Sequence, residues 1–185
     1  MNLPDDILIV GLGMTGVATA RFLSQMGKKI TIVDEKPEQD LFASLKALED
    51  IRFIGHFGSH RREDFLDHPL IIISPGVDSE LPLLKEAREK GIKVIGEMEL
   101  ASRFIVEPII AITGTNGKTT VTTIIGEMFK KAFGNIFVGG NIGDPLINYV
   151  LKGAKARALI AEVSSFQLET IETFRPQTSI LLNIT

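Results

Sequence analysis

Residues 111–125, AITGTNGKTTVTTII, have the residue types and spacing of a loop that binds a triphosphate. The glycines at positions 114 and 117 let successive backbone N–H groups point inward, and Lys118 can reach the β- and γ-phosphates. The hydroxyl of Thr119 can bind Mg²⁺. The run departs from the full G-x-x-x-x-G-K-[ST] pattern because Ile112 occupies the first glycine position. It lies between an apolar run and a helix-like segment, which favours a P-loop over a plain strand–helix turn.

Two further polar residues are expected beside this loop. Residues 158–163 predict a strand that places Glu162 near its carboxyl end, where a P-loop enzyme requires a carboxylate to hold Mg²⁺. The run GGNIGDP, residues 139–145, follows another expected strand, so Asn141 would face the same site. The local alternatives are an exposed strand-end acid at Glu162 and a turn-forming asparagine at Asn141.

A second phosphate-binding pattern lies near the N-terminus. The run GLGMTG, residues 11–16, satisfies G-x-G-x-x-G between an apolar run and a helix-like segment, which suits a diphosphate. Asp34 ends the second apolar run, where its carboxylate can accept hydrogen bonds from a ribose or a base. Ser74, in the run SPG, can donate to a phosphate or sugar oxygen. Alone, these residues favour an NAD-dependent dehydrogenase. Glycines that only permit close packing, and an ordinary Pro-Gly turn, are the alternatives.

The elements that must position these residues follow from apolar runs that alternate with helical patterns. Such alternation predicts parallel sheets covered on both faces. The expected strands are residues 7–10, 29–33, 51–54, 70–73, 92–95, 109–113, 135–138, 158–163 and 178–183. The expected helices are residues 17–26, 41–49, 82–90, 118–131 and 145–151, with a short helical stretch at 96–104. We therefore predict an α/β fold, with a Rossmann-like doubly wound parallel sheet in residues 1–96 and part of a P-loop α/β domain in residues 97–185.

Composition narrows the functional class. Hydrophobic residues make up 44% of the chain and the net charge is −3, which gives no electrostatic case for nucleic acid. Cysteine is absent, so disulfides and thiolate metal sites are excluded and a reducing compartment fits. The sequence has no apolar run long enough to span a membrane and no signal-peptide pattern at its start. We expect a cytoplasmic monomer that binds neither membranes nor nucleic acid.

Other titratable residues are expected to have a lesser role. His56 and His60 have a spacing that could bind metal on a helix, but the intervening glycine argues against one. Glu97 and Glu99 are expected on a solvated helix between the domains. The sequence stops at LLNIT, at the carboxyl end of an expected strand, so we expect the second domain to be incomplete.

Taken in order, GLGMTG, VDE, SPGV, TGTNGKTT, GGNIG and EVSSFQLE resemble the Mur ligase family, and the resemblance covers residues 5–185. It implies that the first loop binds the UDP part of a UDP-sugar and that the second loop binds ATP. The implied UDP-sugar contacts are Gly11, Gly13, Met14, Thr15, Gly16, Asp34, Ser74, Pro75, Gly76 and Asn141. The implied ATP contacts are Gly114, Thr115, Asn116, Gly117, Lys118, Thr119 and Thr120, with Mg²⁺ held by Thr119 and Glu162. The implied catalytic residues are Lys118, Glu162 and Asn141.

The resemblance also implies a reaction. The dinucleotide-type first domain together with SSFQLE favours the branch that joins D-glutamate to UDP-N-acetylmuramoyl-L-alanine in peptidoglycan precursor synthesis. There the alanyl carboxylate attacks ATP to form an acyl phosphate, and the amine of D-glutamate then displaces phosphate. Because family members are much longer, this chain is expected to be a fragment that binds the UDP-sugar at most and does not ligate.

Three rival interpretations remain. A nicotinamide-dependent oxidoreductase built on residues 1–96 leaves the Lys118 loop unexplained. A non-catalytic nucleotide-binding module agrees with a missing C-terminal part. A P-loop kinase or ATPase would have no use for a UDP-type first domain.

Overall fold

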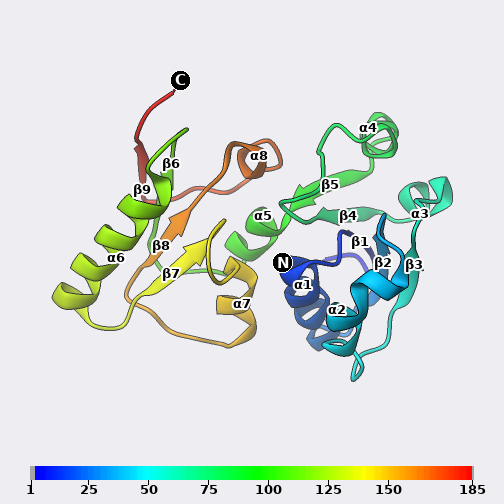
Figure 1. Ribbon diagram of the computed structural model, residues 1–185, viewed down its shortest axis with the longest axis horizontal. Coiled ribbons are helices and arrows are strands. Elements are labelled where there is room, and N and C mark those ends of the chain that lie inside the picture. The colour runs from blue at the N-terminus through cyan, green and yellow to red at the C-terminus, as the bar shows by residue number, and fades with distance from the viewer. Residues whose placement is uncertain (1–2, 185) are drawn as a thin grey trace.

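The computed structural model describes residues 3–184, which form two sheets with helices packed against them (Figure 1). The expected domain limits at residues 1 and 185 lie outside the described residues. The first sheet has the order β3-β2-β1-β4-β5 and comprises β1 (Asp6–Val10), β2 (Lys29–Asp34), β3 (Ile54–Phe57), β4 (Leu70–Ile73) and β5 (Lys93–Gly96). The second has the order β7-β8-β6-β9 and comprises β6 (Ile109–Thr113), β7 (Phe137–Gly140), β8 (Leu159–Glu162) and β9 (Thr178–Leu181).

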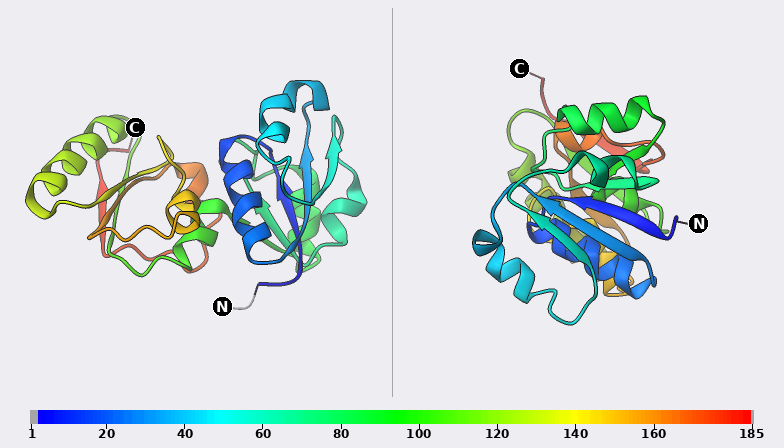
Figure 2. Two further views of the ribbon diagram at one scale, coloured as in Figure 1. Left: turned by 90° about the horizontal axis from the view of Figure 1, so that it is seen from below. Right: turned by 90° about the vertical axis from the view of Figure 1, so that its right-hand side faces the viewer.

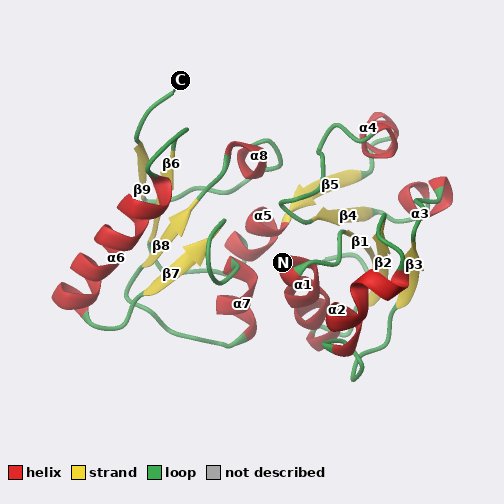
Figure 3. Cartoon of the chain, viewed as in Figure 1, coloured by secondary structure: helices red, strands yellow, loops and turns green. Residues whose placement is uncertain are grey.

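Helices connect the strands, as the red ribbons of Figure 3 show. In the first half they are α1 (Met14–Gln25), the 3₁₀ helix η1 (Glu38–Leu41), α2 (Phe42–Lys46), α3 (Arg62–Leu66) and α4 (Pro82–Glu89). The later helices are α5 (Glu97–Ser102), α6 (Lys118–Phe133), α7 (Leu146–Leu151) and α8 (Ser165–Leu168). Within residues 3–184, no helix has the length and apolar character needed to cross a membrane.

Parallel pairing follows from the near-continuous apolar strands. All four residues of β4 are buried, as are residues 7–10 of β1, because helices cover both faces of the first sheet. Each strand pair among the described residues is parallel. The carboxyl ends of the strands in each sheet therefore lie at one edge, and the loops with candidate functional residues leave from that edge. The predicted α/β fold with parallel sheets is confirmed.

The largest differences from the predicted elements lie at the edge of the first sheet. The sequence predicts a strand at residues 51–54, whereas β3 begins at Ile54, which pairs with Thr31. Ile51 and Phe53 instead pack against the core from the preceding loop, so their apolar character reflects burial and not strand pairing. The predicted helix at residues 41–49 is a 3₁₀ turn followed by a short α2. Helices α3 and α8 are too short to give a periodic pattern and were not predicted.

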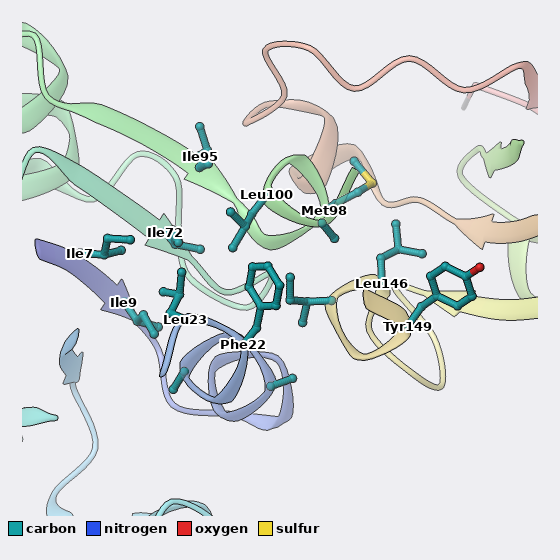
Figure 4. Close-up of a cluster of buried hydrophobic side chains, with 14 of the residues drawn as sticks. Ile7, Ile9, Phe22, Leu23, Ile72, Ile95, Met98, Leu100, Leu146 and Tyr149 are labelled. Carbon is teal, nitrogen blue, oxygen red and sulfur yellow. The ribbon is translucent and has the colours of Figure 1, made fainter. Parts of the chain in front are cut away.

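A single cluster of buried hydrophobic residues joins the two sheets. It extends from β1 and β4 through α1, α5 and α7 to β6 and β8. Figure 4 shows Phe22 of α1, Leu100 of α5 and Leu146 of α7 gathered at the centre of this cluster, and Figure 2 shows α5 in the region between the two sheets. The ring of Phe22 also meets Phe104 edge to face, with centroids 5.0 Å apart. The two halves of the chain therefore share one core.

The structure corrects the prediction that Glu97 and Glu99 lie on a solvated helix. Helix α5 lies between the sheets, and the exposed fractions of these residues are 2% and 0%. The carboxylate of Glu99 accepts N–H hydrogen bonds from Glu172 (2.9 Å), Thr173 (3.0 Å) and Phe174 (2.8 Å). It also accepts the Thr173 hydroxyl at 2.6 Å and forms an ion pair of 2.7 Å with Arg103. Both acids are buried because they bond the backbone of the second half of the chain.

The two acids have opposite pKa shifts. Burial raises the pKa of Glu97 to about 7, although the N–H of Ile147 donates to its carboxylate at 2.6 Å and opposes the rise. The nearby charge of Asp144 adds to the increase. Burial also opposes ionisation of Glu99, but the hydrogen bonds from residues 172–173 and from Arg103 outweigh it and lower its pKa to about 2. Glu99 is therefore ionised where the two halves of the chain meet, whereas the carboxyl group of Glu97 titrates near pH 7.

Candidate functional site

The glycine-rich turn after β1 is held in a conformation that only glycine allows. Gly11 has a φ of +92°, and a Cβ on Gly16 would lie 2.1 Å from the carbonyl oxygen of Gly11. Gly13 is different, because a Cβ there would meet nothing within 4 Å and the residue precedes α1 directly. Gly11 and Gly16 therefore shape the turn, and Gly13 leaves open space at the N-terminus of a 12-residue helix.

Two side chains predicted to contact ligand also brace this turn. The carboxylate of Asp34 accepts the N–H of Leu12 at 2.6 Å and the N–H of Lys36 at 2.9 Å. The hydroxyl of Ser74 donates to the carbonyl oxygen of Gly11 at 2.9 Å. Both residues are buried. Their measured contacts thus fix the turn, while their role toward a ligand stays a prediction.

A cavity of about 490 Å³ opens above this turn and receives residues from both halves of the chain. The predicted UDP-sugar contacts that line it are Gly11, Gly13, Met14, Thr15, Asp34, Ser74, Pro75, Gly76 and Asn141. Gly16 is not among the lining residues, because its α-carbon faces the Gly11 carbonyl. Lys36, which the family resemblance places toward the uracil end of the ligand, also lines the cavity. Glu35, His60 and Asp78 line it too, and the sequence analysis did not include them in the site. The volume suits a small-molecule ligand.

The loop between β6 and α6 has the backbone of a phosphate-binding loop. Gly114 and Gly117 have φ values of 143° and 85°, which favour glycine, and Gly117 is the N-cap of α6. The first N–H groups of a helix have no acceptor within it, and here they belong to Lys118, Thr119 and Thr120. The ammonium of Lys118 donates to the carbonyls of Gly114 (2.7 Å) and Thr115 (3.1 Å), so it lies folded over the loop.

Asn183 holds this loop, and sequence reasoning missed it. The backbone carbonyl of Asn183 accepts the N–H of Thr115 at 3.1 Å. Its side-chain oxygen accepts the N–H of Asn116 at 2.9 Å, and its side-chain nitrogen donates to the Asn116 carbonyl at 3.1 Å. These two N–H groups therefore face β9 and not the mouth of the loop. The available signal was position, because Asn183 follows β9 at the carboxyl edge next to β6.

Glu162 connects the phosphate-binding loop to the cavity. One carboxylate oxygen accepts the Thr119 hydroxyl at 2.8 Å, and the other accepts the side-chain N–H of Asn141 at 3.0 Å. The residue is 2% exposed. Register explains this placement, because β8 pairs with β6 and β7 and sets Glu162 opposite Ile112 and Gly140. The structure thus brings together three residues that the sequence analysis placed at one edge.

This arrangement fits a hard divalent cation. No cation pairs with the buried Glu162 among residues 3–184, and its described donors are an uncharged hydroxyl and an amide. Mg²⁺ usually binds one or two carboxylates together with phosphate oxygens and water. Within the described chain there is no group of three or more acidic or histidine side chains that could enclose a metal ion unaided. The donor set therefore fits Mg²⁺ if phosphate oxygens and water supply the remaining ligands.

Sequence comparison shows which family has this arrangement of two glycine-rich loops on parallel sheets. Residues 5–96 match the family description "Mur ligase MurD-like, N-terminal domain", and residues 112–185 match "Mur ligase middle domain". The fold is that of an α/β protein with two parallel sheets, each with a glycine-rich loop at its carboxyl edge. The chain belongs to the Mur ligase family.

Individual relatives narrow the comparison. A UDP-N-acetylmuramoylalanine--D-glutamate ligase of Desulfosudis oleivorans is 51% identical over 96% of this chain and 39% of its own length. The enzyme of the same name from Desulfatibacillum aliphaticivorans is also 51% identical, over 97% of this chain and 40% of its length. The chain thus spans about 40% of the curated relatives that it matches.

Solved structures agree on the fold. UDP-N-acetylmuramate-alanine ligase MurC from Thermotoga maritima superposes with a TM-score of 0.53 at 22% identity, over 97% of this chain and 41% of that one. A UDP-N-acetylmuramate:L-alanyl-gamma-D-glutamyl-meso-diaminopimelate ligase from Neisseria meningitides gives 0.57 at 17% identity, over 98% and 61%. At these identities the likeness shows a shared fold.

Proposed function

We propose that this chain is the substrate-binding part of an ATP-dependent ligase that joins D-glutamate to UDP-N-acetylmuramoyl-L-alanine in the cytoplasm. The cavity beside the Gly11–Gly13 turn binds the UDP-sugar, and the Lys118 loop binds ATP. Relatives about half identical to this chain have the name of that enzyme, which supports the proposal. We further propose that the chain is monomeric and does not ligate by itself.

The observation that most strongly supports this proposal is the hydrogen bond from Asn141 to Glu162. Asn141 lines the cavity of the first loop, and Glu162 bonds the Thr119 hydroxyl of the second loop. A ligand that extends from the Gly11–Gly13 turn along this cavity therefore ends beside the phosphate-binding loop. That geometry suits a reaction between the far end of a UDP-sugar and the terminal phosphate of ATP.

Each residue has a distinct part in this proposal. The N–H groups at the start of α6 and the ammonium of Lys118 bind phosphate oxygens. Thr119 and Glu162 hold Mg²⁺, which offsets negative charge on the phosphates when it is bound. Asn141 orients the alanyl end of the UDP-sugar, so the alanyl carboxylate attacks the γ-phosphate of ATP. The bond between the γ-phosphate and ADP breaks, ADP leaves, and an acyl phosphate forms. The amine of D-glutamate then displaces phosphate through a tetrahedral intermediate and forms the amide.

Calorimetric titration with UDP-N-acetylmuramoyl-L-alanine tests the first half of the proposal. Gly13→Ala is the informative variant, because its Cβ meets no protein atom within 4 Å and would extend into the space beside the helix N-terminus. We expect the UDP-sugar to bind the parent chain and to bind Gly13→Ala much more weakly, with an unchanged melting temperature. Ser44→Ala, outside the cavity, is the matched control. Tighter binding of NADH than of the UDP-sugar would favour the oxidoreductase alternative and contradict the proposal.

A further inference from the structure

The three histidines of the chain differ in how their ring nitrogens are used. His56 bonds the carboxylate of Asp64 at 2.8 Å, and both nitrogens of His68 are bonded, to the Asp64 carbonyl (2.7 Å) and the Thr31 hydroxyl (2.9 Å). His60 has no hydrogen-bond partner anywhere in residues 3–184, although its Nδ1 is shut off from solvent. An atom that is closed to solvent is closed to a ligand as well, so the ring nitrogen available to a molecule in the cavity is Nε2, which has no partner among these residues and is not shut off.

His60 is held in place beside the cavity. It lies in the loop after β3, where Gly58, with a φ of +92°, donates its N–H to the Asp34 carbonyl at 3.0 Å. The imidazole packs edge to face against the fully buried ring of Phe65, with centroids 5.4 Å apart. The residue lines the cavity together with Asp34 and Lys36. Its ring is therefore positioned by packing and by the β2–β3 connection, and no hydrogen bond of its own holds it.

Sheet order shows which part of a ligand His60 would meet. The phosphate-binding turn follows β1, Asp34 and Lys36 follow β2, and His60 follows β3, in the spatial order β1-β2-β3 along one sheet edge. In a Rossmann-like sheet the diphosphate lies at the turn after the first strand, and the ribose side lies at the end of the second. His60 is one strand farther from the phosphates. It therefore belongs to the nucleoside side of the cavity.

We propose that His60 binds the base of the pyrimidine nucleoside diphosphate and contributes to selection of uracil. This inference rests on the proposed function of the cavity. Uracil presents two carbonyl acceptors beside one N–H donor, and the Nε2 of a neutral imidazole donates or accepts according to its tautomer, so it can bond either kind of group. A ring whose Nε2 is unused and which is already ordered by Phe65 forms such a hydrogen bond without losing another one or much rotamer entropy.

The test is a histidine-selective ¹⁵N NMR titration of the full chain with UDP, with inorganic pyrophosphate as the probe that lacks a base. Because the chain has three histidines, every ring can be followed in one spectrum. We expect UDP to shift the ring-nitrogen signals of His60 while those of His56 and His68 stay in place. Pyrophosphate should leave all three unchanged. Equal shifts of His60 with pyrophosphate would overturn its place on the nucleoside side.

The variant His60→Phe separates ligand contact from structure, because it retains an aromatic ring against Phe65 and removes both nitrogens. We expect the Kd for UDP to rise about 3- to 10-fold, the range that one net hydrogen bond supplies, while the Kd for pyrophosphate stays constant. The preference for UDP over CDP should fall by a similar factor. If the parent chain binds UDP and the ring-nitrogen signals of His60 do not shift, His60 has no role in binding the base. The same conclusion follows if His60→Phe binds UDP with unchanged affinity. Failure of the parent chain to bind UDP at all refutes instead the proposed function of the cavity.

Discussion

Replacement of Glu97 by glutamine should remove a pH dependence from the stability of this protein. Glu97 is buried between the sheets, accepts one N–H from Ile147, and has a pKa raised from 4.5 to about 7. In the unfolded chain the same carboxyl ionises near its ordinary value. Between these two values the folded state binds the proton and the unfolded state does not, so the free energy of unfolding falls as the pH rises.

The size of the effect follows from the shift. A pKa difference between 4.5 and about 7 corresponds to about 3 kcal/mol at 1.36 kcal/mol per unit. The stabilisation from Glu97 is fully present below the unfolded pKa and is lost by the time the pH passes about 7. Glutamine retains an oxygen that can accept the Ile147 N–H but does not ionise. The variant should therefore lack this loss.

Urea denaturation at several pH values between about 5 and 8 measures the effect directly. The unfolding free energy of the parent protein should fall relative to that of Glu97→Gln by about 2.5 kcal/mol across this range, because part of the total is already lost at about pH 5. Glu127→Gln, at an exposed position of α6, is the matched control and should retain the slope of the parent. If the parent and Glu97→Gln give parallel pH profiles, the titrating group is not Glu97 and the reasoning fails.

Three further substitutions test the contacts described above. Glu99→Ala removes one of the two carboxylates that pair with Arg103 and leaves three backbone N–H groups without their acceptor, so urea denaturation should show a loss of roughly 3–5 kcal/mol; a loss below about 1 kcal/mol would contradict an anchoring role. Asn183→Ala should speed amide hydrogen exchange at Asn116, which loses its side-chain acceptor, but not at Thr115, which retains the backbone carbonyl of residue 183; unchanged exchange at Asn116 would mean that β9 alone orders the loop. Gly16→Ala should be strongly destabilised and Gly13→Ala nearly neutral in thermal melts, because only the first Cβ meets a backbone oxygen at 2.1 Å; equal melting temperatures would argue against this difference.

The strands, the parallel sheets and the glycine-rich turns could be predicted from the sequence because each depends on residues that are close together in the chain. Apolar runs such as β4 are buried on both faces and are bounded by turn residues, so strand and parallel sheet follow from the pattern alone. The two glycine-rich turns were recognised for the same reason, since the spacing of the glycines reflects the backbone conformation that each turn needs. The carboxyl-edge rule then placed Glu162 and Asn141 near Thr119, and the structure brings them into contact.

The contacts that escaped prediction join residues far apart in the sequence. Glu99 accepts hydrogen bonds from the backbone of residues 172–174, and Glu97 accepts one from Ile147. No sequence motif marks these partners. A charged residue on a short helix normally faces solvent, so composition suggested the wrong environment. Asn183 was missed for a similar reason, because its bonds to the loop depend on the pairing of β6 with β9. The unused nitrogens of His60 become visible only when the partners of every other histidine are known.

The shared core has a consequence for how this polypeptide can be divided. Severing the chain after β5 would leave α1, with Phe22 at its centre, without the apolar partners that α5 and α7 supply. Such a half would expose a large hydrophobic patch and would be prone to aggregate. Sequence families treat the two segments as separate modules, yet neither is a freestanding module here. The two segments should therefore be expressed and engineered as one unit, and thermal unfolding of the chain should be a single cooperative transition.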